Sequence, residues 1–296
     1  MKFRTEYEAS KAPFTLDPDK PIVLVGSCFS QNIAKKMEDH SWKAVNPLGT
    51  LYNPLSICLA IDMMLDTEKG MKRFERSLFQ ANGVWNSENF DSSFSSKDKD
   101  DCLDEFKIRR RIFDETLREG GMLIVTFGTS ICYYTTEKRL PVGNCHKQPS
   151  NLFYTQRMTP SQILSYWEVV NENLESKYPG LKTIFTVSPV RHLKDGFVGN
   201  ARSKAVLLLG IEDICSYVPG SFYFPAYEIL NDDLRDYRFY ASDLAHPSEE
   251  AIDYIWEKFK DTFIDREGHI LLNKRAAQVR ASLHRPLTGA LGKPLV

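Results

Sequence analysis

The stretch from Ile22 to Ser30, with the sequence IVLVGSCFS, constrains the fold of this chain more than any other. Its apolar, β-branched first half predicts a buried strand, and the spacing of Phe29, Ile33 and Met37 predicts a helix directly after it. The glycine between them permits a tight turn, and the new helix aims free N–H groups at anything negative nearby. Ser27, which follows the glycine, is therefore either a nucleophile at the edge of a sheet or an ordinary helix N-cap.

A second motif, near the other end of the chain, bears on that choice. Asp243 and His246 lie three residues apart, just ahead of a predicted amphipathic helix, so one short loop can point both side chains the same way. An imidazole that is hydrogen-bonded to a carboxylate can take a proton from a serine and later return it. The other interpretation is that Asp243 caps a turn and His246 lies on the surface. Together the two motifs favour a triad of Ser27, His246 and Asp243.

The alternation of strands and helices along the chain predicts the fold class. Continuous apolar runs are typical of buried parallel strands, and helical patterns separate them here. The main strand candidates are residues 22–26, 122–127, 183–187 and 222–227. This order predicts an α/β protein, a three-layer α/β/α sandwich with a mostly parallel sheet.

The expected organisation is one large domain with two additions. Residues 1–265 form the domain, and an insertion near 71–98 contains a β-hairpin that turns at Asn82-Gly83. Residues 266–296 are expected to form a C-terminal helix and a tail. The long connection 131–158 shows few regular patterns, and long loops at the carboxyl edge of a sheet usually carry binding groups.

Several blocks of the sequence resemble a known family. The block GSCFS at 26–30 is similar to the signature of the GSCFA family, in which the last residue is often alanine. Further blocks that resemble the family are GTLYNP at 49–54, TFGTS at 126–130, NCHK at 144–147, SPVRH at 188–192 and DLAHPS at 243–248. The resemblance implies the SGNH (GDSL-like) hydrolase superfamily, with a flavodoxin-like strand order. It also implies ester hydrolysis or acyl transfer, with Ser27 as nucleophile, His246 as base and then acid, and Asp243 orienting the imidazole.

The resemblance further implies where an oxyanion hole forms. Backbone N–H groups near the nucleophile and at Gly49 are the expected donors, although Gly49 is equally compatible with a plain turn. In many SGNH enzymes an asparagine lies two residues after the glycine that corresponds to Gly128, and here that position is Ser130. A further donor is therefore expected from Ser130, Asn53 or Asn144, of which Asn53, close to Gly49 in the chain, is preferred.

Three more residues are expected to contact the substrate. His146 lies in the long loop, in a run that places an amide, an imidazole and an ammonium side by side. Arg191 and His192 follow a predicted strand and so lie at the same carboxyl edge. His192 is a rival to His246 as the base, but it lacks an aspartate at the favourable spacing.

Two other functions compete with the serine hydrolase. The first is a catalytically inactive module that binds a glycan or an acyl group in the same pocket, which the missing asparagine supports. The second is a thiol enzyme that uses Cys28. It is disfavoured because Ser27 holds the position after the glycine and Cys28 is expected to point into the packing between helix and sheet.

Composition limits the partners and the location. The 38 lysines and arginines nearly cancel the 39 aspartates and glutamates, so nothing attracts the chain generally to nucleic acid or to an anionic membrane. No apolar run is long enough to span a bilayer and the first residues do not resemble a signal peptide, which predicts a cytoplasmic protein. Six cysteines without a C-x-x-C pair predict reduced, mostly buried thiols. No metal or organic cofactor is implied, the expected partner is a small-molecule or glycan ester, and the oligomeric state stays open.

Overall fold

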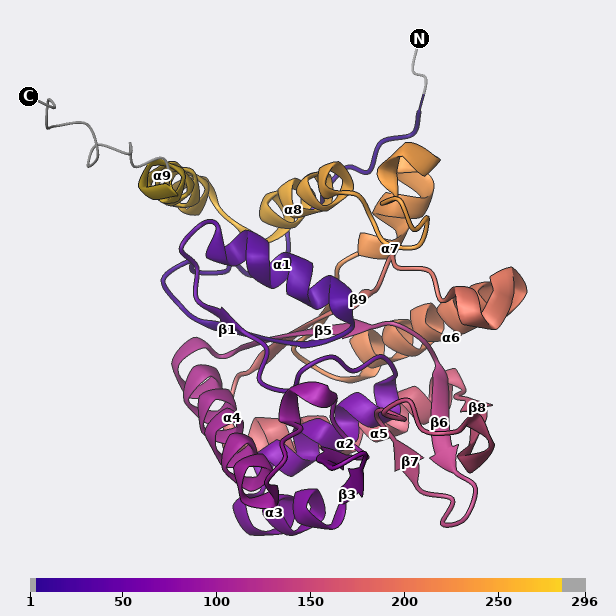
Figure 1. Cartoon of the computed structure of the whole chain (residues 1–296). Coiled ribbons are helices and arrows are strands. Elements are labelled where there is room, and N and C mark those ends of the chain that lie inside the picture. Colours follow the sequence, from indigo (N-terminus) through magenta and orange to yellow (C-terminus); the bar gives the residue numbers. More distant parts are fainter. Residues whose placement is uncertain (1–3, 284–296) are drawn as a thin grey trace, which may run out of the picture.

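A computed structural model describes residues 4–283 of the chain. Its centre is a parallel sheet of five strands, in the order β10-β9-β5-β1-β2, with helices on both faces (Figure 1). The strands are β1 (Ile22–Gly26), β2 (Ala44–Val45), β5 (Met122–Phe127), β9 (Lys182–Val187) and β10 (Ser221–Tyr223). Counted within the sheet this is the order 2-1-3-4-5, which is the flavodoxin-like arrangement. The predicted α/β fold class with a mostly parallel sheet is confirmed.

The alternation of side chains along β1 divides the hydrophobic core into two parts. Val23 and Val25 point into the core on one face, and Ile22 and Leu24 point into the core on the other, because successive side chains of a strand face opposite ways. The first core is covered by α2 (Pro54–Leu65), α4 (Lys99–Gly120), α5 (Pro160–Lys177) and α6 (Gly196–Tyr217). The second is covered by α1 (Cys28–Glu38) and α8 (Glu249–Phe263) (Figure 1). α1 and α8 therefore lie on the same side of the sheet.

Helix boundaries follow local sequence rules. Asn53 caps α2 by accepting a hydrogen bond from the Ser56 N–H, with Pro54 as the first helical residue. Thr159 closes a capping box at the start of α5. Gly121, with φ +62°, ends α4 in the left-handed conformation that glycine adopts easily. These three boundaries agree with the sequence pattern.

The insertion contains the predicted hairpin together with a helix that the sequence pattern did not reveal. The hairpin pairs β3 (Leu78–Ala81) with β4 (Val84–Ser87) across the Asn82-Gly83 turn. The unpredicted helix is α3 (Thr67–Arg76), and the short 3-10 helix η1 (Ser92–Phe94) follows the hairpin. Phe74, Phe90 and Phe94 are buried in the first core, so this region packs onto the main domain.

Two further predictions about elements were wrong. The connection 131–158 is not irregular, because it forms a second, antiparallel sheet in the order β7-β6-β8. The elements there are β6 (Ile131–Thr135), β7 (Pro141–Val142), η2 (Ser150–Leu152) and β8 (Phe153–Arg157). The predicted strand 222–227 ends at Tyr223, and the chain continues through α7 (Ala226–Glu228) and the π-helix η4 (Ile229–Leu234).

The two ends of the described chain pack against the second core. Ala12 and Leu16 donate backbone hydrogen bonds to the carbonyls of Thr262 and Phe263, at the end of α8. The helix α9 (Arg266–Leu283) contributes Leu272 to the same core. The tail predicted after this helix falls at 284–296, outside the described residues. Within residues 4–283, no helix combines the length and the apolar composition needed to cross a membrane.

Gly26 is expected to tolerate no side chain. Its φ is +125°, and an added Cβ would collide with the carbonyl of Thr126 on β5. We expect Gly26→Ala to lower the free energy of unfolding by at least about 3 kcal/mol, measured by urea denaturation. The matched control is Gly83→Ala, because Gly83 also has a positive φ of +76° but no atom within 4 Å of the added Cβ. That change should cost only about 1–2 kcal/mol, and equal losses in both variants would contradict the packing at β1.

Candidate active site

The predicted site residues gather at the carboxyl edge of the sheet. The backbone N–H of Ser27 donates to the Thr126 carbonyl, so the ends of β1 and β5 stay paired beyond the strands. Beyond β5, Gly128 N–H donates to the Tyr52 carbonyl, which brings the segment before α2 to the same edge. Ligands of open parallel sheets bind at this edge.

A contact between Cys28 and His246 is the central feature of this edge. Cys28 is the first residue of α1, and its Sγ lies 3.5 Å from Nε2 of His246. Nδ1 of the same imidazole lies 2.6 Å from Oδ2 of Asp243. The predicted pair of histidine and aspartate is therefore formed, but the side chain in contact with it is the thiol of Cys28.

The loop that carries the pair is held rigidly. Oδ1 of Asp243 accepts hydrogen bonds from the N–H groups of Ala245 and His246, at 2.9 and 3.0 Å. These N–H groups, that of His246 first, lower the pKa of Asp243 to about 2, so the carboxylate stays charged around neutral pH. Leu244 has a φ of +57°, an unusual conformation for a non-glycine residue and one that is often found at functional sites.

Ser27, the predicted nucleophile, makes no hydrogen bond to His246 in the described structure. Its side chain is 1% exposed, and its Oγ has no hydrogen-bond partner within the described structure. It occupies the N-cap position of α1 without a side-chain capping hydrogen bond, and its N–H donates to the Thr126 carbonyl. The reason is geometric: Ser27 is extended, with φ −71° and ψ 171°, while Cys28 is already helical, so the two neighbours face different ways. The turn directs Ser27 inward against Gly128 and leaves Cys28 half-buried beside the loop.

The start of α1 favours negative charge at the thiol. Burial raises the pKa of Cys28 above its usual value, while its own backbone N–H, the Lys204 ammonium and the N–H of Phe29 act in the opposite direction. The N–H of Cys28 makes no hydrogen bond to any residue in the range 4–283, as expected for the first turn of a helix. The thiol is therefore protonated at rest, with a base in contact and a free donor next to it.

Tyr52, His192 and Lys204 surround this contact. The rings of Tyr52 and His192 meet edge to face, with centroids 5.7 Å apart. Burial raises the pKa of Tyr52, and the nearby Cys28 adds to the shift. Burial also lowers the pKa of His192, whose Nδ1 lies 3.9 Å from Oδ2 of Asp195, too far for a hydrogen bond. The expectation that His192 lacks a suitably spaced aspartate was therefore wrong, because Asp195 lies three residues after it. Without a hydrogen bond to that aspartate, His192 is still a weaker candidate for the base than His246.

The residues proposed for the oxyanion hole differ in whether their hydrogen-bond donors are already used within the fold. Ser130 is 0% exposed and both its N–H and its hydroxyl donate to the Ser203 hydroxyl, so that expectation was wrong. Gly128 is also engaged, because its N–H bonds Tyr52 and its carbonyl accepts from Lys204. Oδ1 of Asn53 caps α2, and no hydrogen bond of its Nδ2 is found in the described part of the chain.

Gly49 lies in a constrained turn near the same edge. Its φ is +68°, and an added Cβ would lie 2.6 Å from Oδ1 of Asp91. Oδ2 of Asp91 accepts a hydrogen bond from the Thr50 N–H at 2.6 Å, while the Gly49 N–H has no partner in residues 4–283. The structure is therefore compatible with both expectations for Gly49, a turn glycine and an oxyanion donor.

The loop with Asn144 and His146 has a structural role. Oδ1 of Asn144 accepts from the His146 N–H at 2.8 Å. Nε2 of His146 lies 2.7 Å from the Ser87 carbonyl and 3.0 Å from the Phe90 carbonyl, which ties the loop to the insertion. The expected contacts of these two side chains with substrate are therefore not supported. No group of three His, Cys, Asp or Glu side chains within 4–283 is arranged to hold a metal ion.

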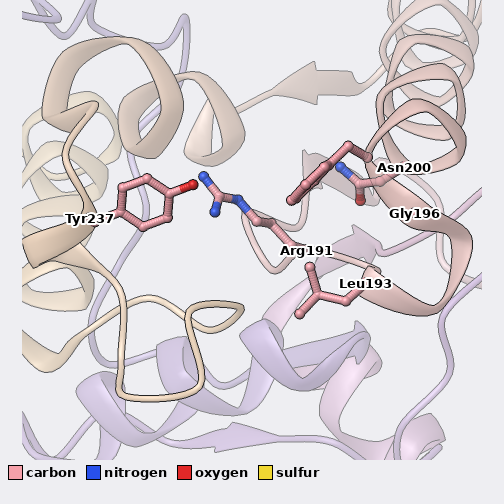
Figure 2. Close-up of a pocket in the computed structure, with 6 residues that line it drawn as sticks. Arg191, Leu193, Gly196, Asn200 and Tyr237 are labelled. Atoms are coloured by element: carbon pink, nitrogen blue, oxygen red, sulfur yellow. The ribbon is translucent and has the colours of Figure 1, made fainter.

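A pocket of about 270 Å³ adjoins the loop that carries Asp243 and His246. Arg191 links the two, because its N–H donates to the Ala245 carbonyl and its guanidinium lies over the Tyr240 ring at 4.0 Å. Figure 2 shows Arg191 extending toward Tyr237, with Leu193 and Asn200 on the other side of the pocket. Arg191 forms no ion pair within the described chain, so the pocket is suited to a group that is partly apolar and negatively charged. The predicted position of Arg191 near the site agrees with this arrangement.

Fold and site together define an α/β protein with a thiol, an imidazole and a carboxylate in contact at the carboxyl edge of a parallel sheet. The chain belongs to the GSCFA family, whose model matches residues 21–259. A comparison with curated protein sequences gave no match. Among solved structures, the periplasmic domain of a lipopolysaccharide acetyltransferase from Salmonella ser. Paratyphi A aligns with a TM-score of 0.35 and 7% identity. That alignment covers 83% of this chain and 85% of the other.

Proposed function

We propose that this protein is an acyl-transferring or ester-hydrolysing enzyme that forms a thioester on Cys28, within the SGNH superfamily. The observation that carries the proposal is the chain of contacts from Sγ of Cys28 through His246 to Asp243, at 3.5 and 2.6 Å. A nucleophile in contact with a base, which is itself oriented by a third group, is the arrangement that covalent catalysis requires.

The first half of the reaction forms the thioester. Asp243 accepts the Nδ1–H of His246, which leaves Nε2 with the lone pair that faces the thiol. Nε2 takes the thiol proton while Sγ attacks the acyl carbonyl, whose electron pair moves to the oxygen. The tetrahedral intermediate then collapses, and the departing alcohol takes the proton from Nε2.

The second half releases the acyl group. Water or a second alcohol gives its proton to Nε2 of His246 while its oxygen attacks the thioester carbonyl. The Cys28 sulfur leaves and recovers the proton from the imidazole. Water as the acceptor gives hydrolysis, and an alcohol gives transfer, so the same three residues serve both outcomes.

The oxyanion of both tetrahedral intermediates requires donors at the start of α1. The free backbone N–H of Cys28 is the first proposed donor, because it adjoins the attacking sulfur and belongs to a helix N-terminus. The Gly49 N–H and the side-chain NH2 group of Asn53 are the proposed additional donors, since neither group has an acceptor in the described residues. Ser27 N–H and Ser130 are excluded because their hydrogen bonds are used within the fold.

Trapping the acyl-enzyme tests the proposal directly. We expect incubation with p-nitrophenyl acetate, followed by acid quenching, to leave one acetyl group on the peptide that contains Cys28. Ser27 and Cys28 share every tryptic peptide, so neutral hydroxylamine must distinguish them: it removes an acetyl group from a thioester and leaves a serine ester intact. Cys145, another half-buried thiol, is the internal control and should stay unmodified. An acetyl group that resists hydroxylamine and lies on Ser27 would support the serine hydrolase hypothesis instead. The absence of any acetylation would favour the binding module.

A further inference from the structure

The pocket beside the loop 243–246 contains a positive charge that the proposed mechanism does not use. Arg191 lines this pocket and forms no ion pair within residues 4–283. Arg109 and Arg275, which are half-buried like Arg191, each pair with a carboxylate. Three carboxylates on the segments around the pocket lie beside other groups: Asp195 beside His192, Asp236 beside Arg238, and Asp243 beside His246. The charge of Arg191 is therefore left for a ligand.

Aromatic rings hold the guanidinium of Arg191 in place. It lies 4.0 Å from the centre of the Tyr240 ring and 5.1 Å from that of the Tyr237 ring, and Figure 2 shows it extending toward Tyr237. Ring faces attract a cation without using up its N–H donors as carbonyls do. One N–H makes a long hydrogen bond, at 3.5 Å, to the Leu244 carbonyl, and no carboxylate of the described chain accepts from the others. The guanidinium is thus positioned and available.

The other side of the pocket adds an amide and apolar surface. Oδ1 of Asn200 accepts a hydrogen bond from the His192 N–H at 3.0 Å, and the NH2 group of Asn200 has no acceptor in residues 4–283. Leu193 and Phe197 also line the pocket, and they are 49% and 76% exposed. The lining therefore suits a planar oxyanion that is attached to a short apolar group.

A carboxylate matches this lining better than a phosphate. Arg191 is the one cationic side chain among the lining residues of the described chain. A phosphate monoester carries roughly two negative charges at neutral pH, of which a single guanidinium compensates one. A carboxylate carries one charge, and its two oxygens fit two parallel N–H donors of a guanidinium. The ligand inferred for this pocket is therefore a carboxylate.

Backbone contacts join the pocket to the loop of the proposed base. The Arg191 N–H donates to the Ala245 carbonyl at 3.0 Å, and Nη1 of the same residue contacts the Leu244 carbonyl. Leu244 and Ala245 are the two residues between Asp243 and His246. A carboxylate bound to Arg191 therefore lies beside the loop that presents the imidazole.

We propose that Arg191 is a specificity-determining residue that selects ester substrates bearing a carboxylate. This inference rests on the proposed function, and it names the substrate class: a carboxylate separated from the scissile ester by a short aliphatic or aromatic spacer. The guanidinium binds the carboxylate, the Asn200 amide adds a further donor, and the spacer packs against Leu193 and Phe197. The carboxylate belongs either to the acyl part or to the alcohol part of the ester, and the two arms of the experiment distinguish these sources.

Two pairs of substrates, each differing by one carboxylate, test the proposal. In the acyl pair, mono-p-nitrophenyl adipate is compared with p-nitrophenyl methyl adipate, and in the alcohol pair, p-acetoxybenzoate is compared with its methyl ester. The readout is the ratio of kcat/KM for the acid to that for the methyl ester, after subtraction of the enzyme-free rate. We expect a ratio of at least about ten in one pair, which identifies the part that carries the carboxylate. Ratios near one in both pairs for the wild type would overturn the proposal.

Substitution of Arg191 shows whether the guanidinium causes this preference. In Arg191→Met the ratio should fall to near one, because the charge-assisted hydrogen bonds are lost. Arg191→Lys should keep part of the preference, since an ammonium keeps the charge but lacks the planar pair of donors. The matched control is Arg110→Met, because Arg110 on α4 is also half-buried without an ion pair in the described residues and donates to the Thr67 hydroxyl. The control should keep the ratio of the wild type, and an unchanged ratio in Arg191→Met would overturn the proposal.

Ligands without a scissile ester separate this proposal from the proposed enzyme. We expect adipate or p-hydroxybenzoate to bind the wild type at least about tenfold more tightly than Arg191→Met, measured by saturation-transfer NMR. If this difference is present but no acetyl group is trapped on Cys28, the carboxylate site stands and the proposed enzyme fails. If an acetyl group is trapped but both proteins bind both ligands equally, the enzyme stands and the carboxylate site is overturned. Should Arg191→Met not fold, the wild-type ratios and Arg191→Lys decide.

Discussion

Cys28→Ala is expected to lower the rate of ester cleavage by at least about a thousandfold, because the residue that forms the covalent intermediate is removed. Ser27→Ala is expected to retain activity within about twofold, since the Ser27 hydroxyl makes no hydrogen bond within residues 4–283 that the change would remove. Initial rates on p-nitrophenyl acetate, with urea unfolding of each variant, measure both effects.

The adjacent pair also supplies its own control. Cys28→Ser places an oxygen nucleophile at the same position, and its rate is expected to remain far below that of the wild type, because a hydroxyl is a much weaker acid than a thiol. Thermal stability should be similar in all three variants, since each change is small and confined to one turn. Full activity in Cys28→Ala together with loss of activity in Ser27→Ala would contradict the prediction and identify Ser27 as the nucleophile.

His246→Ala is expected to reduce the rate by about a hundredfold to ten-thousandfold, because the protonated thiol loses the base that activates it. Adding Cys28→Ala to this variant should cause little further loss, since nucleophile and base act as one unit. Asp243→Asn should cost less than either change. The measurement is the initial rate of ester cleavage as a function of pH.

Two other histidines make this prediction specific. His269→Ala removes a half-buried imidazole that contacts the Lys260 carbonyl on α8, and it should leave the rate unchanged. His192→Ala tests the rival base beside Tyr52 and should have a much smaller effect than His246→Ala. A larger loss in His192→Ala would assign the proton transfer to His192 and leave the His246–Asp243 contact without a catalytic role.

Elements governed by local rules could be predicted from the sequence. The strand, glycine and helix at residues 22–38, the Asn53-Pro54 and Thr159-Pro160 helix starts, and the Asn82-Gly83 turn all depend on neighbouring residues. The small sheet β7-β6-β8 could not be predicted, because its strands are short and partly exposed and therefore lack a strong apolar pattern. The helix α3 was missed because only Gly70 and Phe74 in it are buried.

The site was predicted in part for a similar reason. Asp243 and His246 are close in the chain, and their spacing alone brings them into contact. The choice between Ser27 and Cys28 depends on which residue is the first in helical conformation, a difference of one position that periodicity cannot resolve. Ser130 was misassigned because its partner, Ser203, is 73 residues away, and Lys204 was missed because nothing in its sequence context marks a buried amine.

Cys28 and His246, the proposed nucleophile and base, are 218 positions apart, yet α1 and α8 pack into one core on the same face of the sheet. Ribosomes synthesise the chain from its N-terminus, so Cys28 is synthesised before His246. Until His246 and α8 have emerged, no His246 imidazole can contact the thiol. The centre therefore assembles among the last events of folding. In a nascent or C-terminally truncated chain that lacks His246, Cys28 has no imidazole beside it, so the proposed reactivity arises only when the domain is complete.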